Sequence, residues 1–221
     1  MVPSLPRFPP PALAHAQGNR QRDVTSQDMN WGPFPSALPE NMANIIAKAT
    51  EVAHSAAVSL ATVSQIKIGQ ELPPVPLKEN EPNSSVSIHN LPGRIILVGV
   101  PGAFTPTCSS QAPGYIENYE KFTAKGIQGI YVISVNDAFV TKAWKAKLSG
   151  DKETSVRFLA DDKASFSGGL GLTFDATAGL GGIRAQRFVL VVNDGKVENI
   201  FVEPDASKTT ITAAEEVLAK L

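Results

Sequence analysis

Residues 94–108 read Arg-Ile-Ile-Leu-Val-Gly-Val-Pro-Gly-Ala-Phe-Thr-Pro-Thr-Cys. The apolar run 95–100 predicts a buried strand, and the Pro-Gly pair after it predicts a tight loop. Thr105 suits the N-cap of a following helix because its hydroxyl can accept a hydrogen bond from a free amide, and Pro106 suits the first helical position because it has no amide to leave unpaired. Cys108 then lies in the first helical turn, where the helix dipole favours a thiolate. The stretch therefore predicts a strand, a loop and a helix that opens with a reactive cysteine.

Cys108 is the only cysteine in the 221 residues. A lone cysteine is commonly a small buried hydrophobe, but the neighbours Thr107, Ser109 and Ser110 are polar, and we therefore favour a nucleophile. Lowering a thiol pKa from about 8.5 to about 6 raises the thiolate population roughly thirtyfold, worth ~2 kcal/mol. Fast enzymatic chemistry needs ~8 kcal/mol or more, so a reactive cysteine needs partners that stabilise developing charge.

Composition describes an ordinary soluble protein with one substantial core. Its 20 basic and 21 acidic residues are dispersed, which excludes a strong field for nucleic acid and gives no sign of a membrane partner. A single cysteine excludes an internal disulfide and a four-cysteine zinc site, and three scattered histidines do not suggest a metal cluster. We expect neither a metal nor a cofactor.

The two ends of the chain carry weaker signals. Residues 1–40 are rich in proline without apolar periodicity, and we expect a disordered or removable extension there. Residues 41–65 are expected to form a helical segment before a domain at 66–221. The cysteine content favours a reducing intracellular compartment, with the cytoplasm as the expected location. A basic start favours the mitochondrion as an alternative, and residues 219–221, Ala-Lys-Leu, are similar to a peroxisomal address.

The order of predicted elements within the domain indicates an α/β fold. Strands and helices alternate three times, and a hairpin around an Asn-Asp-Gly turn and a final helix follow. The predicted strands are 95–100, 129–135, 156–159, 187–192 and 196–202, and the predicted helices are 107–124 with an interruption near Pro113-Gly114, 137–148, 163–170 and 210–221. Such an order resembles a thioredoxin-like fold, a central mixed sheet with helices on both faces. Thioredoxins carry Cys-x-x-Cys at the helix start, whereas Thr105 replaces the first cysteine here, so dithiol exchange within one site is impossible.

From about residue 66 to residue 221 the chain resembles the peroxiredoxins of the type 5, or type II, subfamily. The resemblance rests on residues 101–109, which match the pattern Pro-x-x-x-Thr-x-x-Cys, on Ser-Val-Asn-Asp at 134–137, and on Arg-Phe at 187–188. It implies a thiol peroxidase that acts on hydrogen peroxide and alkyl hydroperoxides, and a homodimer.

The resemblance also implies site residues. Cys108 is then the peroxidatic nucleophile, Thr105 a hydrogen-bond partner of the peroxide, Pro101 a shield against water, and Arg187 the cation beside the sulfur. A guanidinium favours the anion and orients a peroxide through paired donors.

Two other arginines compete for the cationic role. Arg157 lies within the predicted strand 156–159, and Arg184 follows the glycine-rich stretch 179–182, which in relatives is a surface or dimer-contact loop. We favour Arg187 because it precedes Phe188 at a strand start. The glycine stretch does not join a strand to a helix and lacks the lysine of a phosphate-binding loop.

A resolving cysteine is absent from both positions where relatives carry one, here Ile211 and Val132. The sulfenic acid therefore has to react with an external thiol, either glutathione with glutaredoxin or thioredoxin.

Two alternative functions use the same cysteine. A peroxide sensor or redox-switched binding protein needs oxidation without sustained turnover. A cysteine hydrolase needs a histidine in contact with the sulfur, and His89 is the only histidine within the predicted domain.

Overall fold

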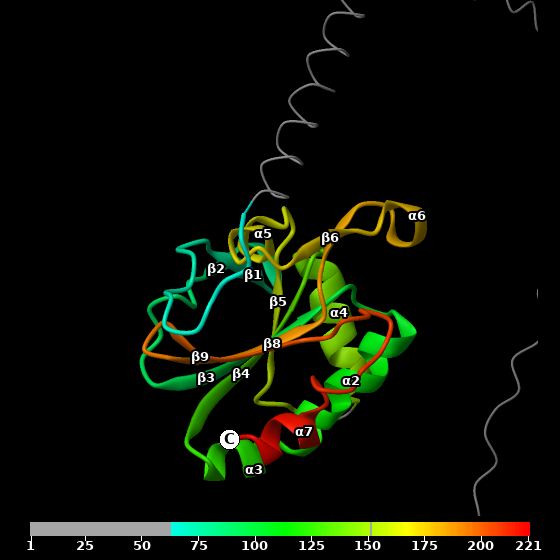
Figure 1. Ribbon diagram of the computed structural model, residues 1–221. Coiled ribbons are helices and arrows are strands. Elements are labelled where there is room, and N and C mark those ends of the chain that lie inside the picture. The colour runs from blue at the N-terminus through cyan, green and yellow to red at the C-terminus, as the bar shows by residue number, and fades with distance from the viewer. Residues whose placement is uncertain (1–62, 151) are drawn as a thin grey trace, which may run out of the picture. The chain divides into compact units, whose positions relative to one another are not determined.

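The apolar run 95–100 lies in an interior strand of a seven-stranded sheet, between the central strand and the hairpin (Figure 1). The computed structural model describes residues 63–150 and 152–221. The predicted extension 1–40, and the predicted helical segment 41–65 up to residue 62, lie outside the described residues. Sheet order is β2-β1-β5-β4-β3-β8-β9, with bounds β1 Leu77–Glu79, β2 Glu81–Val86, β3 Arg94–Val100, β4 Ile127–Ser134, β5 Arg157–Ala160, β8 Phe188–Asn193 and β9 Lys196–Val202.

Strand directions confirm the mixed sheet. Strands β3, β4 and β5 are parallel, whereas β8 pairs antiparallel with both β3 and β9, and β1 pairs antiparallel with β2 and β5. A separate two-stranded sheet contains β6 Thr173–Asp175 and β7 Ile183–Ala185.

Helices cover both faces of the main sheet. Their bounds are α2 Pro106–Glu117, α3 Tyr119–Ala124, α4 Ala138–Ser149, α5 Ser165–Gly169, α6 Thr177–Leu180 and α7 Ala214–Ala219. On β3 the side chains alternate: Leu97 packs in one cluster with Phe166 of α5, and Val98 packs in the other with residues of α2, α4 and α7. The thioredoxin-like α/β architecture predicted from the element order is confirmed. No helix among the described residues has the length and apolar character needed to cross a membrane.

Helix α2 differs from its prediction. The interruption predicted at Pro113-Gly114 is wrong, because α2 continues through Pro113 to Glu117, and the break before α3 lies at Asn118. The Asn118 side chain donates to the Gly114 carbonyl at 2.8 Å and so satisfies an acceptor at the break. A Cβ on Gly114 would lie 3.2 Å from that of Ala214, so the missing side chain lets α7 pack closely.

The last helix also begins later than predicted, at Ala214 rather than near Thr210. The carboxylate of Glu203 accepts the backbone amides of Thr210 at 2.6 Å and of Thr212 at 2.9 Å. Because Glu203 accepts both amides, residues 210–212 do not adopt a helical conformation, and α7 begins after them.

The hairpin places Arg187 at the sheet. The predicted turn is confirmed, with Asp194 and Gly195 at φ of 47° and 79° between β8 and β9. At the other end of β8, Phe188 lies opposite Gly99 in the register, and a Cβ on Gly99 would collide with the Phe188 ring. The bare glycine therefore lets Phe188, and Arg187 before it, sit close to the end of β3.

Candidate active site

Cys108 is the third residue of α2, which follows the carboxyl end of β3 after the loop 101–105. Its side chain is 0% exposed and packs in the apolar cluster of β3, α2, α4 and α7. The helix begins as predicted, with Thr105 at the N-cap and Pro106 at the first position. Nearby, the Trp144 indole donates to the Ser109 hydroxyl at 3.1 Å and ties α4 to this first turn.

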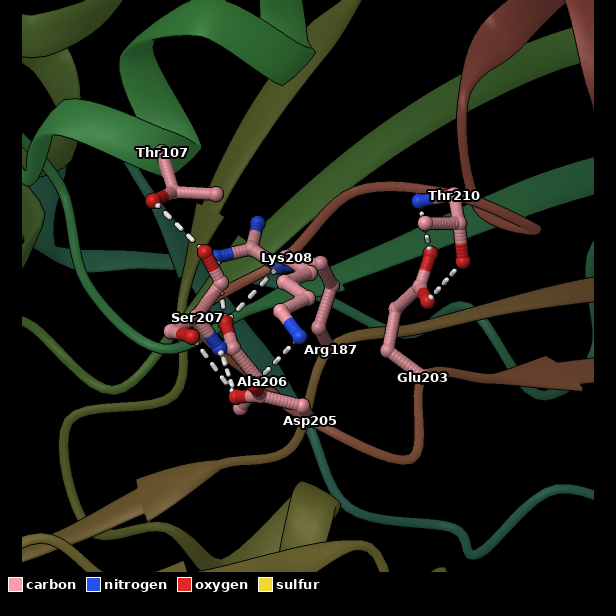
Figure 2. A network of polar contacts seen from close by, with 8 residues as sticks. All are labelled: Thr107, Arg187, Glu203, Asp205, Ala206, Ser207, Lys208 and Thr210. Atoms are coloured by element: carbon pink, nitrogen blue, oxygen red, sulfur yellow. Dashed lines mark hydrogen bonds and ion pairs between the residues drawn. The ribbon is translucent and has the colours of Figure 1, made fainter.

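Arg187 lies against the sulfur. Its side chain is only 1% exposed, and Nη2 donates to Sγ of Cys108 at 3.4 Å. Nη1 donates to Oε1 of Gln111 at 2.5 Å, and both Nε and Nη2 donate to the Ala206 carbonyl, at 3.0 and 2.8 Å. Figure 2 shows the guanidinium beside Ala206. A buried cation in contact with a sulfur favours the thiolate over the thiol.

The hydroxyl of Thr105 does not cap the helix. It donates to the Gly102 carbonyl at 3.0 Å, and no side-chain bond to an amide of α2 forms. The sequence prediction of an accepting hydroxyl at the N-cap is therefore wrong. The reason is the tight turn before it, in which Phe104 has a φ of 62° and Gly102 faces Thr105. With its proton committed to Gly102, the hydroxyl oxygen keeps its lone pairs free to accept from a ligand.

A cavity of about 590 Å³ lies over these residues. Pro101, Thr105 and Arg187 line one part of it, and Phe174 and Leu180 give it an apolar wall. Three of the four predicted site residues therefore line one cavity, and the fourth, Cys108, lies behind this lining in contact with Arg187.

The two competing arginines make other contacts. Arg184 donates to the carbonyls of Val135 at 2.8 Å and Leu180 at 2.6 Å. Arg157 pairs with Glu79 at 2.5 Å, and the hydrogen bond to that carboxylate raises the pKa of Arg157 despite the opposing effect of partial burial. Arg187 alone among these three contacts the sulfur.

Two polar residues that the sequence analysis missed support Arg187: Gln111 accepts from it, and Thr212 accepts from Gln111. The Nε2 of Gln111 donates to the carbonyl and to the hydroxyl of Thr212, both at 2.9 Å. Tyr115 also donates to the Thr212 carbonyl, at 2.7 Å, and burial raises the pKa of its phenol. The available signal was spacing: Gln111 comes three residues after Cys108 and therefore shares its helix face.

A metal centre or a histidine base finds no support among residues 63–150 and 152–221. These residues contain no group of three or more potential metal-ligating side chains. The backbone of His89 approaches Gly195 in the β8–β9 turn, at the end of the sheet opposite to Cys108. Within the described part of the chain, the cysteine-hydrolase alternative therefore has no histidine base.

Comparison with known proteins supports the resemblance. Residues 67–218 match the Redoxin family model. Peroxisomal membrane associated protein 20 of Schizosaccharomyces pombe is 47% identical over 71% of this chain and 99% of its own length. Peroxiredoxin-2C of Oryza sativa is 43% identical over 62% of this chain and 84% of its own.

Solved structures agree in fold. Reduced Prx3 from Vibrio vulnificus has 37% identity and a TM-score of 0.64, over 71% of this chain and 98% of that one. The antioxidant protein of Plasmodium falciparum, described as a 1-Cys peroxiredoxin, has 27% identity and a TM-score of 0.63, over 69% of this chain and 96% of that one.

Proposed function

The chain belongs to the redoxin family as a peroxiredoxin, and on that premise we propose that it reduces hydrogen peroxide and alkyl hydroperoxides at Cys108. The observation that carries the proposal is the 3.4 Å contact between the Arg187 guanidinium and the Cys108 sulfur, with both side chains buried. Removed from water, a cation stabilises an anionic sulfur more strongly than it does in solution.

The chemical step is a displacement at oxygen. The thiolate of Cys108 attacks one peroxide oxygen, so an S–O bond forms as the O–O bond breaks. The departing oxygen takes a proton and leaves as water or an alcohol. Cys108 is oxidised to the sulfenic acid, and the peroxide accepts the two electrons.

Thr105 and Arg187 are placed to hold the peroxide. The Thr105 oxygen accepts the peroxide O–H, since its own proton is bound to Gly102. Four of the five guanidinium N–H groups of Arg187 have acceptors among the described residues. The second N–H of Nη1 is the donor that we assign to the oxygen on which negative charge develops.

Pro101 and the apolar wall define the surroundings of the peroxide. Pro101 has no backbone N–H and offers no donor of its own to water over the sulfur. Phe174 and Leu180, which line the same cavity, are suited to the organic part of an alkyl hydroperoxide. The same wall does not prevent the smaller hydrogen peroxide from entering.

An external thiol completes the cycle. The sulfenic acid reacts with a first thiol to give a mixed disulfide and water, and a second thiol releases Cys108 as the free thiol. Glutathione with glutaredoxin, or thioredoxin, supplies these two thiols in our proposal. Because Cys108 is 0% exposed, the first turn of α2 has to open before a protein thiol reaches it.

Steady-state peroxide removal tests the proposed function. We expect many equivalents of peroxide to be consumed per chain with excess glutathione and glutaredoxin, or with thioredoxin and its reductase. Each reductant is offered separately, and recovery of the free thiol identifies the one that works. Consumption of a single equivalent with every reductant would contradict an enzyme and favour the peroxide sensor.

Assembly and location are further parts of the proposal. A homodimer is expected from the resemblance, and equilibrium sedimentation tests it. The Schizosaccharomyces pombe relative is named as a peroxisomal membrane associated protein, which supports a peroxisomal location here. Imaging of the full chain, labelled at its amino end and with residues 219–221 retained or deleted, tests this against the cytoplasm and the mitochondrion.

A further inference from the structure

Glu203 is a buried carboxylate that the proposed reaction does not use. It follows β9, is 4% exposed, and accepts four hydrogen bonds. The Thr210 amide and hydroxyl donate at 2.6 Å each, and the Thr212 amide and hydroxyl donate at 2.9 Å each. Figure 2 shows the carboxylate with its contacts to Thr210. Burial opposes ionisation, but these hydrogen bonds outweigh it and hold the pKa of Glu203 below its ordinary value.

One path of hydrogen bonds leads from this carboxylate to the sulfur. The Thr212 hydroxyl gives its proton to Glu203, so its oxygen is left to accept from Nε2 of Gln111. That contact turns the amide oxygen of Gln111 toward Arg187, which donates to it at 2.5 Å and to Cys108 at 3.4 Å. From Nη1 of Arg187 to Glu203 every donor points toward the ionised carboxylate, which sets that direction, whereas Nη2 of Arg187 donates the other way, to the sulfur.

A second path runs through the backbone. The Glu203 amide donates to the Arg187 carbonyl at 2.9 Å. Its carboxylate draws Thr210 back, which closes the loop 204–209 on itself. Ala206 lies in this loop, and its carbonyl accepts two N–H groups of the guanidinium. Glu203 therefore organises both acceptors that hold Arg187, the Ala206 carbonyl and the Gln111 side chain.

We propose that Glu203 is a positioning residue, which holds the Arg187 guanidinium against the Cys108 sulfur through Thr212, Gln111 and the 204–209 loop. The effect of this positioning on the rate of peroxide reduction rests on the proposed peroxidase function. Its effect on the sulfur does not, because the contact between Arg187 and Cys108 exists before any peroxide binds.

If Glu203 acted on the sulfur only through its charge, removing that charge would shift the ionisation of Cys108 in the opposite direction. An anion near the site disfavours the thiolate, so if Glu203 acted only as a charge, its neutralisation would make Cys108 ionise more easily. If Glu203 positions Arg187, the same change loosens the cation and makes the thiolate harder to form. The pH midpoint for alkylation of Cys108 by iodoacetamide, which reacts with the thiolate, distinguishes the two roles.

The first experiment compares Glu203→Gln with Glu198→Gln in the full chain. Glu198 lies on β9, as a partner of Arg94 at 2.7 Å, and loses the same charge outside the site. We expect Glu203→Gln to lower kcat/KM for peroxide by about tenfold or more and to raise the alkylation midpoint, since loss of a supporting partner commonly costs about 10- to 100-fold. Glu198→Gln is expected to stay within about twofold of the parent. An unchanged rate or a lower midpoint in Glu203→Gln overturns the proposal.

A second pair of variants leaves all charges in place. Thr212→Val removes the hydroxyl link, and Thr212→Ser retains it. We expect Thr212→Val to lower the rate and raise the alkylation midpoint in the same direction as Glu203→Gln, and Thr212→Ser to restore both. Should Glu203→Gln not fold, this pair decides, and equal behaviour of valine and serine at 212 overturns the proposal. If the parent protein shows no peroxide turnover, the proposed function fails, while the alkylation midpoints still decide the role of Glu203.

Discussion

Two stretches of chain meet at the Cys108 sulfur, and they are built in different ways. Residues 101–108 form a loop and the start of α2, and within eight consecutive positions they supply the nucleophile, the N-cap and the proline. Residues 203–212 form an irregular segment between β9 and α7, and they supply the Ala206 carbonyl and the anchor for Gln111. The first stretch provides the group that reacts. The second holds the cation that activates it, and it does so with backbone carbonyls and a buried carboxylate.

The largest effect is expected from removing the nucleophile of the first stretch. Cys108→Ser replaces the sulfur with a hydroxyl that does not ionise near neutral pH, and peroxide consumption should fall below detection. Peroxide is followed in single-turnover and steady-state assays. An active serine variant would move the chemistry away from residues 101–108 and break the comparison.

Arg187→Lys tests the guanidinium group that the second stretch positions beside the sulfur. An ammonium keeps the charge but cannot bond Ala206, Gln111 and the sulfur at the same time, so we expect kcat/KM to fall by about 100-fold. Arg157→Lys is the matched control, because Arg157 pairs with Glu79 and neither contacts the sulfur nor lines the cavity. Equal losses in the two variants would show that a general loss of arginine packing, rather than the contact with Cys108, lowers the rate.

The sequence predicted the first stretch well because its conformation depends on near neighbours. An apolar run sets the strand, Pro106 sets the first helical position, and Cys108 follows in the first turn. The hydroxyl direction of Thr105 was not predictable in this way. It depends on the positive φ of Phe104, a conformation that nothing in that side chain favours.

The second stretch was not predicted, because its conformation depends on residues that are distant in the sequence. Its shape depends on hydrogen bonds from one side chain, Glu203, to amides seven and nine residues later. The helical pattern at 210–221 was interpreted as a longer helix because helix propensity depends on local sequence. It does not include the hydrogen bonds by which a distant side chain holds backbone amides outside the helix. The short strands β1 and β2 were missed similarly, since Glu81–Val86 is polar and largely exposed and has no alternation. Arg187, chosen from its neighbour Phe188, is the arginine that contacts the sulfur, and its role in the reaction stays a prediction.

Thr105 is expected to contribute less than Arg187. Thr105→Val removes the oxygen that accepts the peroxide O–H, and we expect kcat/KM to fall by about thirtyfold. Thr105→Ser keeps the hydroxyl and should lie within about threefold of the parent. Stopped-flow peroxide reduction measures both. A valine variant as fast as the serine variant would mean that the first stretch contributes the sulfur alone.

Gly99→Ala tests how the two stretches are brought together. The added methyl collides with the Phe188 ring, and overpacking of this kind costs about 1–3 kcal/mol of unfolding free energy. Gly179→Ala is the control: it lies in α6 with nothing near a new Cβ, and we expect a change below about 1 kcal/mol. Urea unfolding measures both. If the two alanines were equally tolerated, Phe188 would not need the bare backbone of Gly99 to place Arg187.

The smallest expected effect is a pH dependence of stability that comes from Glu203 in the second stretch. Glu203 has a pKa below its ordinary value of 4.5, because hydrogen bonds from Thr210 and Thr212 outweigh the opposing effect of burial. A carboxyl whose pKa is depressed on folding stabilises the protein above its unfolded pKa, and this contribution is lost as the pH falls through the folded pKa. The difference in unfolding free energy between the parent and Glu203→Gln should therefore be full at neutral pH and shrink progressively below about pH 4.5. Urea titrations at stepwise lower pH measure it, with Glu198→Gln as reference. A difference that grows on acidification would mean that burial governs this carboxylate, and that the second stretch keeps its shape without an ionised Glu203.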